Sequence, residues 1–117
     1  MTPDDVRPEV RAWLAANWDP ERSLVAWRRL LLDSGWAAPT WPGEWFGRGL
    51  PAWADGVVAG ELAAIGAVGA AVGSGMALAA PTLLAHGSDE LKRRLLPPTV
   101  TGEQTWCQLF SEPTNGS

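Results

Sequence analysis

A run of residues without a single charge, Leu62 to Ala85, is the feature that most limits how this chain of 117 residues can fold. The run is long enough to cross a bilayer as a helix, and Gly69 and Gly73 have the spacing of close helix contacts in membranes. It consists mainly of alanine and glycine, however, which gain little from lipid, and no aromatic or basic belt flanks it. We therefore expect two buried helices, with Gly66 to Gly75 as the weak point between them.

Three segments place apolar residues at helical spacing along one stripe: Val6 to Trp18, Ser23 to Ser34 and Ala52 to Ala67. Gly35 directly follows the second segment and is a natural stop for a helix. The third segment leads into the uncharged run and forms the first of its two helices. The sequence thus predicts three helices before the glycine-rich break.

Two more helices are predicted after the break. Met76 to His86 is apolar, and Pro81 removes one backbone hydrogen bond, so that it kinks this helix or starts a helical turn. Ser88 is a typical cap for a last helix, which Pro97 and Pro98 are expected to close. Basic residues are expected toward the end of this helix, where they suit the helix dipole: Lys92, Arg93 and Arg94.

The segment from Gly35 to Pro51 contains three prolines and several glycines, so no regular element can run through it. Long loops that are rich in aromatic residues are usually packed or functional. The chain has eight tryptophans, which we expect in the core and at packing seams because each buries a large area. Five of them fall within one stretch of the first half of the chain: Trp27, Trp36, Trp41, Trp45 and Trp53.

The last residues differ from the helical part. Thr105 to Phe110 is predicted as a short strand, which needs a sheet partner, and none follows in the chain. Ser111 to Ser117 is a turn-forming run that, taken alone, is only a weak signal of a site. The predicted fold class is therefore all-α: a bundle of about five helices in residues 1–103, followed in residues 104–117 by one C-terminal strand and loop that begin a further unit.

Composition and the first residues of the chain argue against several classes of protein. The formal net charge of −4 and the isoelectric point near 4.8 argue against a nucleic-acid partner. Cys107 is the only cysteine, so no internal disulfide can form, and a buried thiol is expected in the middle of a strand rather than a nucleophile. The start of the chain carries acids where a secretory signal would carry basic and apolar residues. We expect a cytoplasmic protein with no membrane span and no metal site.

No catalytic group stands out from the residues alone. His86 is the only histidine, and a capping or structural role is favoured because no acid or nucleophile lies beside it in sequence. Glu61 stands alone on an apolar helix and must reach solvent or pair with a cation, for which Arg48 or an arginine of the last helix is the expected partner. No glycine-rich phosphate motif follows a strand.

Three segments, in this order, resemble the acyl-CoA dehydrogenase family: Gly35 to Leu50, Pro81 to Pro98, and Gly102 to Pro113. The family pattern after the strand is Ser or Thr, then Glu-Pro, two small residues, Gly-Ser and usually Asp. This chain departs from it at Thr114 and Asn115 and ends before the usual Asp. It keeps the other pattern residues: Ser111, Glu112, Pro113, Gly116 and Ser117.

The resemblance implies an enzyme that removes a proton from the carbon next to a thioester carbonyl and passes a hydride from the following carbon to FAD, giving an enoyl-CoA. Residues 1–103 would be its N-terminal helical domain, and residues 104–117 the first strand and loop of its middle β-domain. Ser111 would bond the pyrimidine end of the flavin through its hydroxyl and N–H, and Ser117 would meet the acyl-CoA. The residues that would lie along FAD are Gln108, Leu109, Phe110 and Ser111.

In this family the catalytic base is a glutamate of a later helical domain, so neither Glu61 nor Glu112 is assigned that role. We expect no catalytic residue in this chain, which alone would be inactive. The parent enzyme would form a homo- or hetero-oligomer and pass electrons to an electron-transfer flavoprotein, as most relatives do, or to oxygen.

The family also uses the segment before Pro81 to line its acyl pocket. The small residues of that segment leave room, which suggests a long or bulky acyl chain; alternatively, these residues only allow the helices to pack closely. The candidate substrate-binding residues here are Gly73, Met76, Ala77 and Ala80.

A second interpretation of the chain is a free-standing interaction module that recruits a partner through exposed tryptophans and an unpaired strand.

Overall fold

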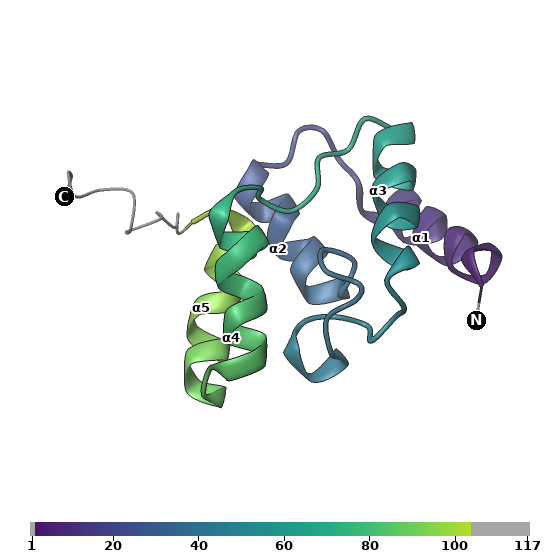
Figure 1. Ribbon diagram of the computed structural model, residues 1–117. Helices are drawn as coiled ribbons and strands as arrows, with labels where there is room; N and C mark the ends of the chain where they lie inside the picture. Colours follow the sequence, from purple (N-terminus) through teal and green to yellow (C-terminus); the bar gives the residue numbers. More distant parts are fainter. Residues whose placement is uncertain (1, 104–117) are drawn as a thin grey trace.

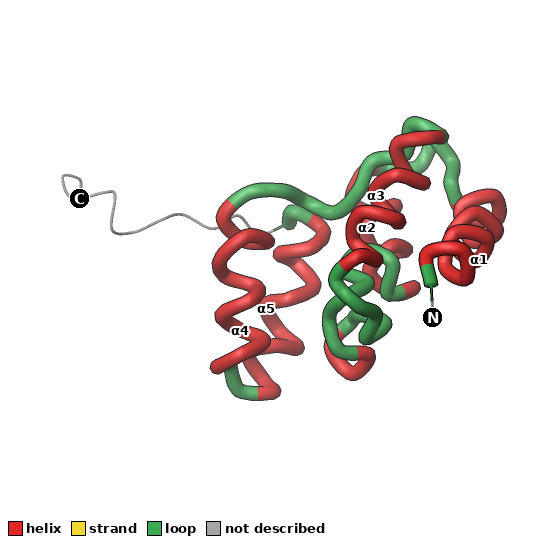
Figure 2. The backbone as a smooth tube through the Cα atoms, turned by 45° about the vertical axis from the view of Figure 1, so that its right-hand side comes forward, coloured by secondary structure: helices red, strands yellow, loops and turns green. Residues whose placement is uncertain are grey.

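The computed structural model describes residues 2–103, which contain five α-helices joined by loops and short helical turns (Figure 1). They are α1 (Pro3–Asn17), α2 (Leu24–Ser34), α3 (Trp53–Ala64), α4 (Ala80–His86) and α5 (Asp89–Thr101). Helix α1 packs along α3, α4 and α5 form a hairpin, and α2 lies between these two pairs (Figures 1 and 2). These residues contain no strand, which confirms the all-α class for them; the predicted strand Thr105 to Phe110 lies outside the described residues.

Local capping explains where several helices begin and end. The Ser23 hydroxyl accepts the Ala26 N–H at 3.1 Å at the start of α2, and Gly35 ends that helix in the left-handed region with φ +85°, as predicted. At the start of α1, the Thr2 N–H donates to the Asp5 carboxylate at 2.7 Å. This hydrogen bond lowers the pKa of Asp5, so the cap contributes stability above the ordinary aspartate pKa and loses it only in more acidic solution.

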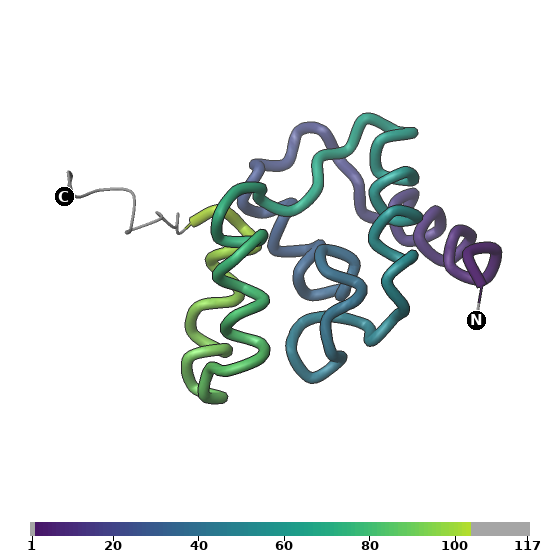
Figure 3. The backbone as a smooth tube through the Cα atoms, in the orientation of Figure 1, coloured from purple at the N-terminus to yellow at the C-terminus, as the bar shows by residue number. Residues whose placement is uncertain are grey.

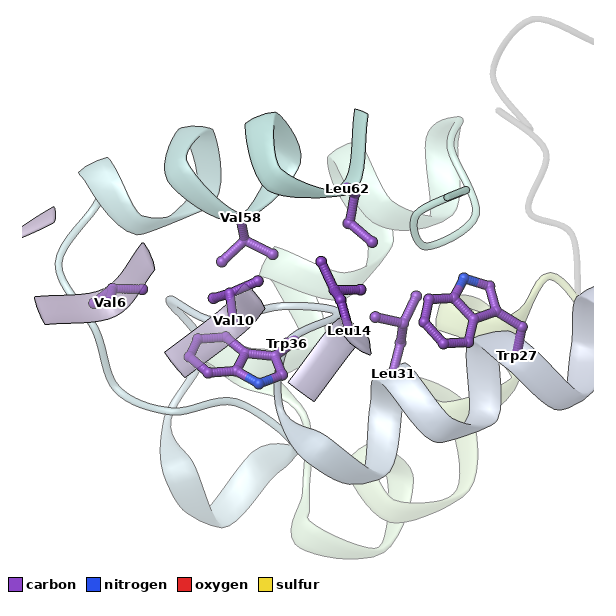
Figure 4. Packing of buried hydrophobic residues seen from close by; sticks show 8 residues of the cluster. All are labelled: Val6, Val10, Leu14, Trp27, Leu31, Trp36, Val58 and Leu62. Carbon is purple, nitrogen blue, oxygen red and sulfur yellow. The ribbon is translucent and has the colours of Figure 1, made fainter. Parts of the chain in front are cut away.

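The core lies where α1, α2 and α3 meet, as Figure 4 shows. Trp27 is 1% exposed, and its ring centroid lies 5.4 Å from that of Trp13 and 4.9 Å from that of Trp18. Seven tryptophans fall within the described residues, of which two are buried and five half-buried, so their predicted place in core and seams is confirmed. The buried residues of this core are Val6, Val10, Leu14, Trp27, Leu31, Trp36, Val58 and Leu62.

An irregular stretch, residues 65–73, crosses from α3 toward α4; we call it the crossover. It confirms the predicted glycine-rich break, although α3 ends at Ala64 rather than Ala67, because Gly66 takes a left-handed φ of +74°. Side chains of α2 hold its backbone: the Trp27 indole N–H donates to the Val68 carbonyl at 2.7 Å, and Arg28 Nε donates to the Gly69 carbonyl at 3.0 Å. The crossover is thus fixed by tertiary bonds in place of helical ones.

The Arg28 guanidinium is expected to contribute measurably to stability, because its Nη1 also approaches the Thr101 carbonyl at the end of α5 at 3.4 Å. Replacement by alanine should lower the free energy of unfolding by about 1–3 kcal/mol, since hydrogen bonds from a charged donor would be lost. Urea denaturation followed by circular dichroism measures this. The neighbouring exposed pair of Arg29 with Glu103 offers a control, because Arg29→Ala should cost no more than about 1 kcal/mol. Equal losses for the two variants would contradict the role of Arg28.

The helix predicted for Met76 to His86 begins one residue earlier, as a π-helical turn, Gly75–Ala79, that leads into α4. In this turn the Ala80 N–H donates to the Gly75 carbonyl, five residues back. Pro81 follows at the second residue of α4, inside a helical run that is continuous from Gly75 to His86, so it leaves one backbone hydrogen bond of that run unmade. Pro81 thus lies where the π-helical turn gives way to the α-helix, in the first turn of α4 but not at the start of the helical run.

The prediction that Pro97 and Pro98 close the last helix is wrong: α5 continues to Thr101 and ends at Gly102, with φ +84°. The final turn is anchored by Leu96 and Val100, both 0% exposed, so packing outweighs the two lost amide donors. The predicted basic end of this helix is wrong for the same reason. With the helix extended, its last turn holds no basic residue, and the three basic residues lie in its first half: Lys92, Arg93 and Arg94.

The long segment between α2 and α3, residues 35–51, is an ordered loop with one short 3-10 turn, Gly43–Trp45 (Figure 3). Its own backbone ties it together: the Pro39 carbonyl accepts the N–H groups of Arg48 and Leu50 at 3.3 and 3.0 Å. The Arg48 guanidinium stacks over the Trp36 ring, 3.6 Å from its centroid. This segment, here called the aromatic loop, is packed as predicted.

Candidate functional site

A cavity of about 300 Å³ lies between the aromatic loop, α3 and the crossover. Helix α3 contributes Asp55, Val58, Ala59 and Leu62, which share one face because they follow helical spacing. The remaining walls come from the aromatic loop (residues 36–41), the crossover and the π-helical turn. We call this space the loop cavity.

The loop cavity has mainly apolar walls and one polar pair. The Thr40 hydroxyl donates to the Asp55 carboxylate at 3.3 Å, and Trp36 and Trp41 also line the cavity. A carboxylate has further lone pairs, so Asp55 can accept another hydrogen bond. Such an arrangement can hold an apolar molecule and orient one polar end of it.

A second hollow, of about 310 Å³, lies between α1 and α3 beside an ion pair. Arg11 donates to Glu61 through Nε at 2.6 Å and Nη2 at 3.3 Å, and this hydrogen bonding, together with the charge of Glu61, raises the pKa of Arg11. The predicted ion pair of Glu61 therefore exists, and the Glu61 side chain in it is only 12% exposed. Its predicted partners are wrong: the packing of α1 along α3 supplies Arg11, whereas Arg48 bonds to Glu9 at 2.6 Å.

The four predicted substrate-binding residues do not share one surface. Met76 is half-buried and lines the loop cavity. Gly73 and Ala77 are exposed on the outside, and Ala80 is 0% exposed in the interior. The segment Gly73 to Ala80 thus has an outer side, where the larger Leu78 is also 51% exposed, and an inner side that carries Met76 and Ala80.

Other predicted site residues fall outside what the structure describes. These are the predicted FAD contacts and the acyl-CoA contact, together with the single cysteine: Gln108, Leu109, Phe110, Ser111, Ser117 and Cys107. His86 is exposed in the last turn of α4, a position compatible with the predicted structural role. Residues 2–103 contain no group of three or more side chains that could hold a metal ion, and none of their helices has the length and apolar character needed to span a bilayer.

The loop cavity was not predicted from the sequence. Its helical wall was visible as one face of α3 with the spacing i, i+3, i+4 and i+7, and the aromatic loop was noted as packed or functional. Helical spacing and composition do not give the position of the aromatic loop relative to α3. Asp55 and Thr40, which are 15 residues apart, meet only in the folded chain.

Residues 2–103 thus form an all-helical unit with a cavity between the aromatic loop, α3 and the crossover. Residues 2–103 match the N-terminal domain of the acyl-CoA dehydrogenases. The chain therefore belongs to the acyl-CoA dehydrogenase family, as the three matching segments predicted.

Relatives and a solved structure from Mycobacterium tuberculosis agree with this. The acyl-CoA dehydrogenase FadE34 is 41% identical over 114 residues, which cover 96% of this chain and 15% of FadE34. The acyl-CoA dehydrogenase IpdE1 is 31% identical, over 97% of this chain and 34% of IpdE1. The crystal structure of the ChsE4-ChsE5 complex superposes with a TM-score of 0.67 at 28% identity, over 95% of this chain and 31% of the matched chain. The chain thus spans at most about a third of the length of these proteins.

Proposed function

We propose that this chain is the N-terminal part of an FAD-dependent acyl-CoA dehydrogenase that oxidises an acyl-CoA thioester to the 2,3-enoyl-CoA. The observation that carries the proposal is the match of residues 2–103 to the N-terminal domain of this family. In the reaction, a base removes a proton from the carbon next to the thioester carbonyl, and a hydride leaves the following carbon. FAD, when bound, accepts that hydride.

The role proposed for this chain is to hold ligands rather than to move protons. Ser111 would hold the pyrimidine end of FAD, at the end of the segment Gln108 to Ser111, and Ser117 would meet the acyl-CoA. None of the residues proposed to contact FAD is among residues 2–103, and no reaction step is assigned to the described part. Glu61 is engaged with Arg11 at 2.6 Å, which supports its exclusion as the base.

The proposed substrate is a long or bulky acyl-CoA. Gly73 and Ala77 are exposed in the segment before Pro81, where their small size leaves room beside the exposed Leu78, an apolar side chain that an acyl group could contact. An oligomer of the parent enzyme is proposed as well, supported by the structural similarity to a chain of the ChsE4-ChsE5 complex. An electron-transfer flavoprotein is the proposed acceptor.

A chimera tests the proposal. This chain replaces the matching segment of FadE34, to which it is 41% identical, and the purified product is assayed for bound FAD and for acyl-CoA-dependent reduction of an electron-accepting dye. We expect the chimera to retain FAD and to be active, whereas the 117-residue chain alone should be inactive. Hexadecanoyl-CoA should be preferred to butyryl-CoA.

A chimera that folds and binds FAD but oxidises no acyl-CoA that FadE34 oxidises would overturn the proposed activity. Should that chimera fail to fold, the same replacement in IpdE1 provides a second test. A preference for butyryl-CoA would overturn only the proposed acyl size, and FAD bound tightly by the chain alone would contradict the view that its flavin site is incomplete.

A further inference from the structure

The loop cavity has the size of a small-molecule site. It lies apart from the exposed residues Gly73 and Ala77 of the segment before Pro81. Its volume is about 300 Å³, twice the roughly 150 Å³ of an apolar protein cavity that takes up benzene. Known ligand pockets begin at about this size. Of the candidate substrate-binding residues, Met76 lines this cavity from the inner side of its segment, whereas Gly73 and Ala77, the exposed residues proposed to meet the acyl group, do not.

The walls of the loop cavity are held in place by contacts away from the cavity. Arg48 stacks on Trp36 and donates from Nε to the Ser34 carbonyl at 2.9 Å, which fixes the aromatic loop. Arg28 holds the Gly69 carbonyl at 3.0 Å and so fixes the crossover side. Because the walls are already ordered, a ligand would lose little affinity to ordering them.

Charge limits what this cavity can bind. Among the described residues that line it, Asp55 is the only ionisable one, and its carboxylate already accepts a hydrogen bond from Thr40. A negatively charged ligand end would be repelled by Asp55, whereas a hydroxyl could donate to it. The apolar remainder would contact aliphatic and indole side chains such as Leu62 and Trp36.

We propose that the loop cavity is a binding site for an uncharged apolar molecule or group that carries a hydroxyl, with the hydroxyl directed to Asp55. The ligand class is that of a neutral alcohol of about eight to twelve carbon atoms, scaled from benzene by cavity volume. This goes beyond the proposed dehydrogenase function and does not depend on it, because every described residue that lines the cavity lies within residues 36–76.

The test uses the 117-residue chain with 1-octanol and octanoate as probes. Binding is followed by two-dimensional ¹H–¹⁵N NMR through the indole N–H signals of Trp36 and Trp41. We expect saturable shifts with 1-octanol and at least about tenfold weaker binding of octanoate. Asp55→Asn should reduce this difference, because it removes the repelling charge and leaves an amide that can bond to either probe.

A matched pair of variants on α3 tests the location. Ala59→Met fills the cavity and should weaken 1-octanol binding about tenfold or more, whereas Ala64→Met, on the same helix but outside the lining, should leave it unchanged. Near-ultraviolet circular dichroism checks that each variant is folded, and Ala70→Met, on the crossover wall, replaces Ala59→Met if that variant is not. Absence of saturable binding, equal binding of both probes, or equal affinity of the filled and control variants would overturn the proposal.

Discussion

Trp27→Ala is expected to lower the free energy of unfolding by about 3–5 kcal/mol, the largest effect of any substitution considered in this chain. Trp27 is 1% exposed and packs against the rings of Trp13 and Trp18, so truncation leaves a large cavity where α1 and α2 meet. It also removes the indole N–H that donates to the Val68 carbonyl at 2.7 Å, which frees one end of the crossover. Urea denaturation followed by far-ultraviolet circular dichroism gives the loss directly.

A comparison of two phenylalanine variants separates the hydrogen bond from the packing. Trp36 is as deeply buried as Trp27, but its indole N–H has no hydrogen-bond partner among the described residues. Trp27→Phe should therefore cost about 1–3 kcal/mol more than Trp36→Phe, because it strands the Val68 carbonyl, whereas Trp36→Phe removes a donor that was already unpaired. Equal costs would show that the bond to Val68 contributes nothing net.

Gly47→Ala is expected to have the second largest effect, a destabilisation of about 1–3 kcal/mol or more. A Cβ atom at Gly47 would lie 2.1 Å from the Trp41 carbonyl oxygen and 2.6 Å from the Trp41 Cβ, so the backbone of the aromatic loop would have to move. The shift would also displace Trp41 from the wall of the loop cavity. Thermal unfolding measures the loss, and the indole signals of the same variant report the displacement.

Gly43 provides the control for this prediction in the same loop. A Cβ atom there would meet nothing within 4 Å, so Gly43→Ala should change the free energy of unfolding by no more than about 0.5 kcal/mol. If both substitutions proved equally harmless, the close approach of Gly47 to Trp41 would not exist in solution.

Helix existence was predictable because it depends on local signals. Apolar spacing, the cap Ser23 and the stop Gly35 lie within a few residues of one another, and the structure places α2 where they predict it. The break within the uncharged run was predictable for the same reason, because Gly66 adopts a left-handed φ that favours glycine. Pattern and propensity agree at these positions, so tertiary packing had nothing to override.

The end of α5 was not predictable, because there a strong local signal is outweighed. Two consecutive prolines argue against a helix, yet Leu96 and Val100 are completely buried on either side of them, against the neighbouring elements of the bundle. The gain from burying these side chains exceeds the cost of the missing amide donors. Burial of this kind depends on residues far away in sequence and leaves no local mark.

The family was predictable from the sequence, whereas the side-chain pairings around the candidate site were not. The matching segments carried the family assignment, because the order of short motifs is a property of the chain itself. The partner of Glu61 and the pairing of Thr40 with Asp55 were beyond reach, since both join side chains of different elements, 50 and 15 residues apart. Spacing along a helix shows which residues share a face, but not which element that face will meet.

For this protein, the linear pattern of residues was sufficient for the helical class, the ordered aromatic loop and the family. Each of these rests on periodicity, turn residues or motifs that are read over short stretches. Three-dimensional packing was needed for the length of α5, for the bonds that hold the crossover and for the loop cavity. These depend on burial and on hydrogen bonds between distant segments, such as Trp27 with Val68, whose free energy exists only once the helices are assembled.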